Sequence, residues 1–160
     1  MNAAGKPNGK PVKASEVVMT ELVLPSHTNS LGGIFGGVIM SWIDICGAIA
    51  AQRHSNKICV TASIDGLDFV APVKSGWVVN LRSRVNCVGK SSIEVGVRVD
   101  AENPQTGATF HTASAYLTFV ALNPDGSKSL VPPLILESEE DLRRNAAAIE
   151  RRSLRRGRRG

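Results

Sequence analysis

The pattern of apolar and polar residues along the chain predicts one strand, one long helix and then a run of strands. Residues 17–24 are rich in apolar side chains and end at Pro25, which is typical of a strand. Residues 34–51 form an almost wholly apolar stretch of helical length. This stretch just reaches the length of a membrane span, but Asp44 near its centre and the interrupting Gly and Ser residues argue against insertion. We therefore expect a helix buried in the protein core.

Strand patterns follow the helix in quick succession. Apolar and polar residues alternate with period two over residues 77–87 and 93–99, two segments that a tight turn joins. Residues 58–70 and 109–121 also have strand character. One strand, one helix and then three or four antiparallel strands predict an α+β protein whose sheet wraps around a single helix. A second, exposed helix is expected from Glu137, because its acidic start and basic end complement the helix dipole.

The distribution of charge along the chain narrows the classes of partner to consider. The chain has 160 residues, 42% of them hydrophobic, and fits one domain. Its net charge of +5 first points to nucleic acid or an anionic membrane. However, residues 143–160 hold eight Arg and one Glu, and residues 1–16 hold three Lys and one Glu, so the body carries 5 − 7 − 2 = −4. With aromatic residues at only 4%, this distribution argues against a nucleic-acid partner.

The cysteines and the N-terminus indicate a cytoplasmic protein. Cys46, Cys59 and Cys87 are odd in number and have no C-x-x-C spacing, as expected of reduced cysteines that pack in a core. Residues 1–15 lack the apolar region of a signal peptide. They are rich in Gly, Pro and Lys, so we expect a flexible basic N-terminal segment.

Several familiar motifs are excluded by their spacing. GKSS at residues 89–92 resembles the end of a P-loop, but Arg84 occupies the position where the first glycine is required. GGIFGG at residues 32–37 lacks the first glycine of G-x-G-x-x-G, and the chain has no G-x-S-x-G elbow. The three histidines have no partner at metal-ligand spacing, so no metal site is expected.

Asp44 is the most informative charged residue. Between Glu21 and Arg53 it is the only charged side chain, and its neighbours on the same helix face cannot neutralise it. Burying an unpaired carboxylate is costly. Two interpretations therefore stay open: a buried Asp that is hydrogen-bonded by another element, or a catalytic carboxylate. The small residues around it would let a substrate or a second backbone approach closely.

The chain resembles the hotdog-fold acyl-CoA thioesterases, above all the bacterial short-chain acyl-CoA thioesterases and the cytosolic acyl-CoA hydrolases of animals. The blocks that carry the resemblance are LPSHTNSLGGIFGGVIMSWIDICGAIAAQRH, VTASIDGLDFVAPVKSG, VNCVGKSSIEVGVRVDAENP and ASAYLTFVAL. They imply a single hotdog domain over residues 16–135, in which an antiparallel five-stranded sheet wraps around one long central helix. The flexible segment 1–15 and an acidic, then Arg-rich, C-terminal helix or tail over residues 136–160 lie outside it.

The resemblance also implies an active site at the interface of a dimer, and dimers of this family often assemble into hexamers. The catalytic carboxylate corresponds to Asp44, and an amide from the opposite subunit corresponds to Asn29. The glycine whose backbone N–H polarises the thioester carbonyl corresponds to Gly36. The hairpin that contacts CoA corresponds to Gly89, Lys90, Ser91 and Ser92. No cofactor is implied, because CoA is part of the substrate.

Elementary chemistry fits these positions. A helix N-terminus offers free N–H groups for an oxyanion. Gly36 lies eight residues, about 12 Å of helix, before Asp44, so one thioester carbon cannot touch both in one chain, which independently predicts a dimer. Asp44 could attack directly or act as a general base for water. Asn29 could orient the water or the thioester, or merely cap a loop, and Lys90 could bind CoA phosphates or be simply solvated.

The sequence therefore predicts an acyl-CoA thioesterase that releases a free acid and CoA. The alternative is a non-catalytic hotdog protein that binds CoA or acyl ligands and uses its Arg-rich tail to recruit nucleic acid or a membrane through phosphate contacts. The tail has two further interpretations: a solvated, partly helical end, or a segment that assists binding of the CoA phosphates.

Overall fold

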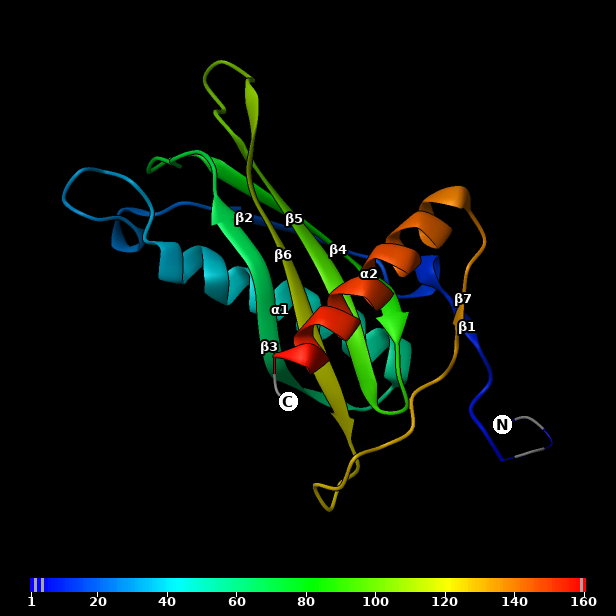
Figure 1. The fold of residues 1–160 in the computed structure, drawn as a ribbon. Helices are drawn as coiled ribbons and strands as arrows, with labels where there is room; N and C mark the ends of the chain where they lie inside the picture. Colours follow the sequence, from blue (N-terminus) through cyan, green and yellow to red (C-terminus); the bar gives the residue numbers. More distant parts are fainter. Residues whose placement is uncertain (2, 4, 159) are drawn as a thin grey trace.

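A five-stranded antiparallel sheet lies between two helices (Figure 1). The computed structural model describes residues 1, 3, 5–158 and 160; Asn2 and Ala4 of the N-terminal segment and Arg159 of the Arg-rich tail lie outside the described residues. The strand order is β2-β4-β5-β6-β3. The strands are β2 (Val17–Leu22), β3 (Ile58–Phe69), β4 (Val78–Val88), β5 (Ser92–Glu102) and β6 (Thr109–Leu122). The predicted α+β fold with one helix against the sheet is confirmed.

Helix α1 (Gly36–Ser55) starts two residues later and ends four residues later than the predicted apolar stretch. Its start is delayed because the preceding backbone is held extended: Ile34 N–H donates to the Val73 carbonyl, and Phe35 N–H to the His27 carbonyl. Its end is set by Asn56, which adopts the left-handed conformation with φ of 53°. The last turn is polar in sequence, so apolar periodicity alone does not reveal it.

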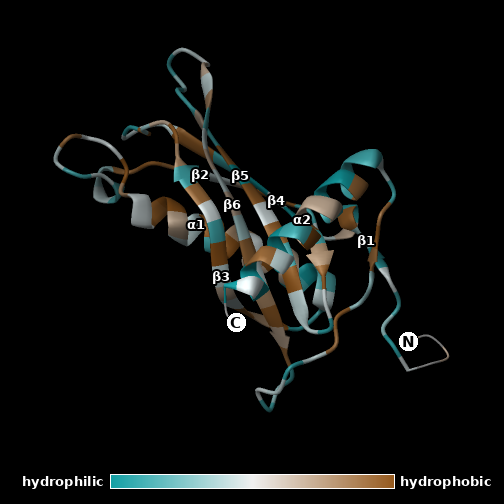
Figure 2. Ribbon diagram, in the orientation of Figure 1, coloured by the Kyte–Doolittle hydropathy of each residue, from teal (hydrophilic) through white to brown (hydrophobic). Residues whose placement is uncertain are grey.

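The core lies between α1 and the inner face of the sheet, where apolar residues alternate along the strands (Figure 2). The apolar side chains that α1 buries are Ile39, Trp42, Ile43, Cys46, Ala50 and Ala51. Gly47 lets the helix approach the sheet closely, since a Cβ there would lie 3.1 Å from Phe119 Cε2. The Ser83 hydroxyl also donates to the Cys46 carbonyl at 2.8 Å, which fixes α1 against β4. Close packing therefore determines how α1 sits against the sheet.

The buried polar and sulfur-bearing side chains fit a reduced core. The three cysteines are all free. His54 is fully buried, with Nε2 at 2.8 Å from the Pro132 carbonyl oxygen, and burial lowers the pKa of His54. Within the described residues, no helix is long and apolar enough to cross a membrane.

The segment that precedes the sheet has more structure than the sequence predicts. β1 (Lys10–Pro11) pairs in parallel with β7 (Leu134–Ile135), and a short 3-10 helix, η1 (Val12–Ala14), follows. A second one, η2 (Pro25–His27), follows β2. Burial of Val12 anchors the end of the segment that we expected to be flexible.

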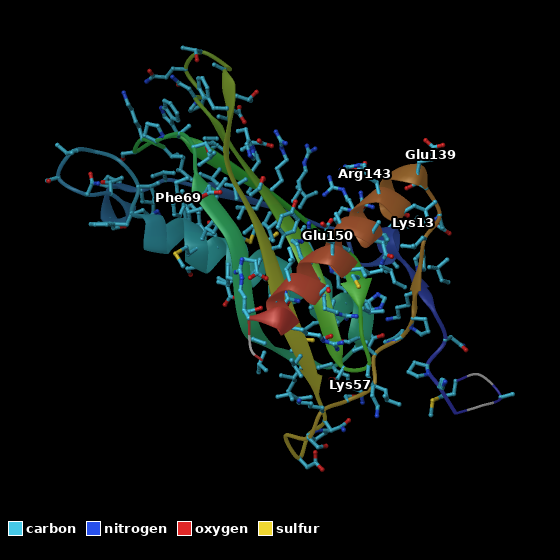
Figure 3. The ribbon with its side chains drawn as sticks, in the orientation of Figure 1. Lys13, Lys57, Phe69, Glu139, Arg143 and Glu150 are labelled. Carbon is cyan, nitrogen blue, oxygen red and sulfur yellow. The ribbon has the colours of Figure 1, made fainter. Side chains whose placement is uncertain are left out.

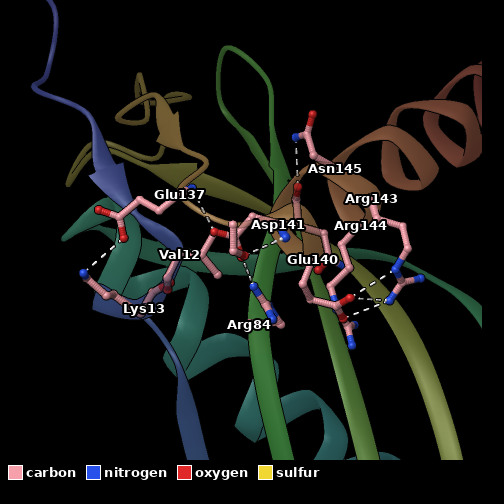
Figure 4. Close-up of polar contacts among 12 residues, drawn as sticks. Val12, Lys13, Arg84, Glu137, Glu140, Asp141, Arg143, Arg144 and Asn145 are labelled. Atoms are coloured by element: carbon pink, nitrogen blue, oxygen red, sulfur yellow. Dashed lines mark hydrogen bonds and ion pairs between the residues drawn. The ribbon is translucent and has the colours of Figure 1, made fainter.

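Helix α2 (Glu139–Gly157) begins two residues after the predicted start at Glu137 and lies against the outer face of the sheet (Figure 1). Ser138 caps it, since its hydroxyl accepts a hydrogen bond from Asp141 N–H at 3.1 Å. The predicted exposure of this helix is wrong along one face, where Asp141 and Ala148 are buried. Figure 4 shows Asp141 paired with Arg84 of β4. Contacts of this kind join elements far apart in sequence, so the local pattern does not reveal them.

The arginines of α2 are largely engaged by the rest of the chain. Arg151 pairs with Glu94 of β5 at 2.6 Å, and Arg155 pairs with Asp65 of β3 at 2.5 Å. The more N-terminal arginines pair along the helix with Glu140 (Figure 4). Much of the basic tail is therefore a helix that the sheet's own carboxylates hold in place.

Candidate active site

Asp44 projects from the middle of α1 and is half-buried. Its Oδ1 accepts a hydrogen bond from the Thr61 hydroxyl of β3 at 2.6 Å. Within the described residues Oδ2 accepts no hydrogen bond. The carboxylate is thus held by one neighbour and has one oxygen available for a water molecule or a substrate.

The strand that holds Asp44 is an open edge of the sheet. β3 pairs with β6 on one side only. It also exposes a row of apolar side chains, with Ile58 68%, Val60 45% and Ile64 38% exposed, and Met40 of the adjoining helix is exposed as well. An unpaired edge with exposed apolar residues is a surface that proteins normally cover. Asp44 therefore lies next to a surface suited to another chain.

A pocket of about 510 Å³ lies at one end of the sheet, between the loop that leads into α1 and the segment that follows β3. Gly36, the first residue of α1, lines it, and no described group accepts a hydrogen bond from the Gly36 N–H. The Phe69 ring covers this position, 3.4 Å from where a Cβ of Gly36 would lie; Figure 3 labels Phe69 at this end of the molecule. The pocket thus presents a free N–H at a helix N-terminus beside apolar walls.

Asn29 lines the same pocket and builds its loop. Its Oδ1 accepts hydrogen bonds from Leu31 N–H at 3.0 Å and Gly33 N–H at 3.2 Å. The loop-capping alternative considered for this residue is therefore observed. The side chain is exposed, and within the described residues its Nδ2 donates no hydrogen bond, so one end of the amide holds the loop and the other is available.

The hairpin between β4 and β5 lies at the opposite end of the sheet from this pocket, because the pocket segment leads into β4 and the hairpin follows it (Figure 1). Gly89 N–H donates to the Ser92 carbonyl at 2.8 Å, and the Ser91 carbonyl accepts from Ala121 N–H at 2.9 Å. Lys90 is exposed at the turn. Arg152 of α2 donates to the Ser92 hydroxyl at 3.2 Å, which places a second cation beside Lys90.

One chain therefore brings together some of the expected site residues and separates the others. Asn29 and Gly36 share one pocket, whereas Asp44 and the hairpin residues 89–92 lie outside it. Two contributors were missed by sequence reasoning: Thr61, which binds Asp44, and Phe69, which covers Gly36. Neither carries a spacing signal, because both contacts join separate elements.

A sheet wrapped around one long helix that carries a half-buried carboxylate matches the hotdog-fold thioesterases that the sequence resembles. The thioesterase superfamily model matches residues 31–108. A Bacillus subtilis protein named uncharacterized acyl-CoA thioester hydrolase YkhA is 41% identical over 146 residues, covering 91% of this chain and 85% of that protein. The chain belongs to the thioesterase superfamily and, within it, to the acyl-CoA thioesterases; it is a thioester hydrolase.

Solved structures agree with this assignment. A crystal structure of an apo-hexameric acyl-CoA thioesterase has a TM-score of 0.92 and 38% identity, covering 96% of this chain and 99% of that chain. The acyl-CoA hydrolase from Staphylococcus aureus, in complex with butyryl-CoA, CoA and CoA disulfide, has a TM-score of 0.87 and 33% identity, covering 94% and 92%. That hydrolase has also been solved as alanine variants of an Asn, an Asp and a Thr, separated by fifteen and then seventeen positions. Asn29, Asp44 and Thr61 have the same two separations.

Proposed function

We propose that the protein hydrolyses acyl-CoA to a carboxylic acid and free CoA at a site that two chains build together. Asp44 and Thr61 come from one chain, and Asn29 and Gly36 come from its partner. The observation that carries this proposal is the Asp44 carboxylate, held by Thr61 at 2.6 Å beside the open edge of β3. The matching separations of the three substituted residues in the Staphylococcus aureus hydrolase support the same assignment.

Two chains are needed because of distance. Gly36 and Asp44 lie on one continuous helix, eight residues or about 12 Å apart, whereas a thioester carbon must be within contact distance of both groups. Symmetric pairing of two β3 edges would cover the exposed row that contains Ile58 and bring the α1 helices of both chains to one interface. The partner's N–H would then complete the site around Asp44.

In the reaction, Asp44 acts as a general base and takes a proton from a water molecule that attacks the thioester carbon. The carbonyl oxygen becomes an oxyanion, which the Gly36 N–H stabilises at the positive end of α1. When the tetrahedral intermediate collapses, the C–S bond breaks and the CoA thiolate takes the proton from Asp44. The Asn29 Nδ2 orients the water or the thioester carbonyl. No cofactor is required, since CoA enters with the substrate.

CoA binding is assigned to the hairpin of residues 89–92. Lys90 and Arg152 provide two cations there, and the Ser92 hydroxyl and the backbone around Gly89 complete the polar surface. Phosphate groups are recognised by such clusters of cations and N–H donors. This contact gives the Arg-rich helix a role in substrate binding and favours that interpretation over recruitment of nucleic acid.

For assembly and location, we propose a dimer that associates further into a trimer of dimers, in the cytoplasm. The hexameric acyl-CoA thioesterase with a TM-score of 0.92 supports the assembly. The three free cysteines support a reducing compartment.

The proposal is tested by measuring release of free CoA from purified protein with a thiol reagent, over acyl-CoAs of increasing chain length. Asp44→Asn should lower kcat by about 100-fold to 10,000-fold, as expected for loss of a general base. Asp125→Asn makes the same chemical change in an exposed turn and should leave kcat unchanged. A folded Asp44→Asn variant that turns over at the wild-type rate would refute the proposal, and CoA binding without any turnover in the wild type would favour the non-catalytic alternative.

The general-base step has its own test. Rapid-quench mass spectrometry during turnover should show an unmodified chain. An acyl adduct on Asp44 would instead establish direct attack and an anhydride intermediate.

A further inference from the structure

A serine, a histidine and an aspartate form a chain of polar contacts on the outer face of the sheet, opposite α1. Ser114 Oγ of β6 lies 3.1 Å from His111 Nε2 of the same strand. His111 Nδ1 in turn lies 3.3 Å from Asp100 Oδ1 of β5. A carboxylate at Nδ1 favours the tautomer that carries its proton there, which leaves Nε2 to accept the hydroxyl proton. A serine in this arrangement can act as a nucleophile, whatever its order along the chain.

A β-bulge puts the serine and the histidine on the same face. Residues three positions apart on a regular strand point to opposite faces of the sheet. The register of β6 with β5 shifts at this point and leaves Thr112 as the extra residue, so His111 faces outwards together with Ser114. Thr112 is fully buried and its hydroxyl has no hydrogen-bond partner, which is costly. A costly irregularity that aligns two reactive side chains calls for a functional explanation.

Arg98 of β5 completes the cluster. Its Nε donates to both carboxylate oxygens of Asp100, at 3.1 and 3.0 Å, which fixes the carboxylate that faces the histidine. Arg98 is also the direct partner of Ser114 in the strand register. Within the described residues its two Nη atoms donate no hydrogen bond. A guanidinium beside the serine can therefore stabilise an oxyanion that forms on a substrate there.

A cavity of about 630 Å³ between α2 and the sheet gives a small molecule access to Ser114, which lines it. This cavity shares no lining residue with the pocket at the start of α1. Arg82 and Arg98 line it as well, and they are direct partners in the register of β4 and β5. Arg82 has no partner among the described residues. Two opposed cations beside the serine favour a substrate that carries a negative charge.

We propose that Ser114 and His111 hydrolyse small, negatively charged oxygen esters at a second site, with Asp100 as the positioning residue for the histidine. Ser114 Oγ attacks the ester carbon while its proton passes to His111 Nε2. The carbonyl oxygen becomes an oxyanion beside Arg98. The C–O bond to the alcohol then breaks, and the alcohol takes the proton from His111. Water attacks the acyl-serine and gives a proton to His111, and the serine oxygen leaves and recovers that proton.

Labelling of the intact protein with an alkyl fluorophosphonate tests the nucleophile, because this reagent phosphonylates an activated serine and releases fluoride. Peptide mapping by mass spectrometry should place the label on Ser114 and not on Ser153, which is exposed on α2. Ser114→Ala should abolish labelling, whereas Ser153→Ala should leave its rate unchanged. His111→Gln should slow labelling at least about 100-fold, as expected for loss of a general base. Protein unfolded in urea should not be labelled.

Two aspartates on either side of Ser114 separate positioning from a general effect of charge. Asp68 of β3 is the register partner of Ser114 on its other side and has no hydrogen bond to His111. Asp100→Asn should slow labelling at least about tenfold. It should also raise the share of the Nε2–H tautomer in the NMR spectrum of the His111 ring nitrogens. Asp68→Asn should leave the tautomer unchanged and should not slow labelling.

The substrate class is tested with two p-nitrophenyl esters of similar size, the anionic monosuccinate and the neutral butyrate, in the Asp44→Asn background. The succinate ester should be hydrolysed at least about threefold faster at low salt, and Arg82→Gln should remove this preference; equal rates for the two esters would overturn the substrate class. Ser114→Ala should retain release of CoA from acyl-CoA, which also shows that it is folded, and Asp44→Asn should retain the label on Ser114. Failure of one site is thus distinguishable from failure of the other. No label on wild-type Ser114, equal labelling of His111→Gln, or ester hydrolysis that Ser114→Ala leaves unchanged would overturn the proposal.

Discussion

Replacing Thr61 by Val tests how the catalytic carboxylate is positioned. The change keeps the shape of the side chain and removes the hydroxyl that donates to Asp44 Oδ1 at 2.6 Å. A hydrogen bond to a charged group contributes about 1.5–3 kcal/mol, and the lower end applies here because Thr61 is exposed and Asp44 only half-buried. A loss of about 1.5 kcal/mol of transition-state stabilisation lowers kcat about tenfold. KM should stay unchanged, since Thr61 acts on Asp44 and not on the substrate.

The assay is steady-state release of CoA, with Thr61→Ser as the matched variant. Serine retains the hydroxyl and should restore most of kcat, whereas Val should not. Thermal unfolding of both variants should match that of the wild type, because the pair lies at the surface. The reasoning is refuted if Thr61→Val retains the wild-type kcat, or if Ser and Val lower it equally.

Three further perturbations test the packing, the buried histidine and the CoA surface. Gly47→Ala should lower the free energy of unfolding in urea by about 1–3 kcal/mol, because the added methyl group overpacks the contact with Phe119. Gly37→Ala places its methyl group in open space and should raise the free energy of unfolding by up to about 1 kcal/mol. Equal effects of the two changes would contradict the close packing at Gly47. Because burial lowers the pKa of His54, the unfolded chain binds a proton first as pH falls below about 6.5. Stability should then decrease by up to about 1.4 kcal/mol per pH unit until the folded pKa is reached, and a His54→Gln variant with the same slope would exclude His54 as the cause. Lys90→Gln should raise KM for acyl-CoA about threefold to tenfold at low salt and less at high salt, with kcat unchanged. Lys128→Gln removes the same charge from a neighbouring exposed turn, so an equal rise in KM in that variant would rule out a specific contact between Lys90 and CoA.

The sequence predicts the five-stranded sheet and its two helices well because each of these elements has a local signal, whereas the short β1, β7 and 3-10 helices have none. Alternation with period two identifies β4 and β5, and the apolar run identifies α1. The ends of elements are less well predicted, because they depend on contacts with other segments. The irregularity inside β3, where Gly66 has φ of 62° and the register with β6 shifts between Asp65 and Asp68, is one such detail that the strand pattern of residues 58–70 does not reveal.

The candidate site could be predicted only as far as single residues are unusual in their surroundings. Asp44 is recognisable as the lone charge in an apolar helix. Its partner Thr61 is an ordinary strand residue, and nothing in the seventeen-residue separation predicts their contact. The opposed pair of Arg82 and Arg98 is likewise invisible before the strand register is known. Contacts between elements are set by packing, which a one-dimensional pattern does not contain.

Mixing two inactive variants tests most directly whether the active site is shared between chains. Asp44→Asn and Asn29→Ala homodimers should each hydrolyse acyl-CoA poorly. After subunit exchange of an equimolar mixture, half of the dimers are mixed, and each mixed dimer carries one intact site and one doubly altered site. Activity should therefore rise to about a quarter of the wild-type value. If the mixture shows only the average of the two variants after exchange is complete, Asn29 and Asp44 do not act together across the interface, and the two-chain site is wrong.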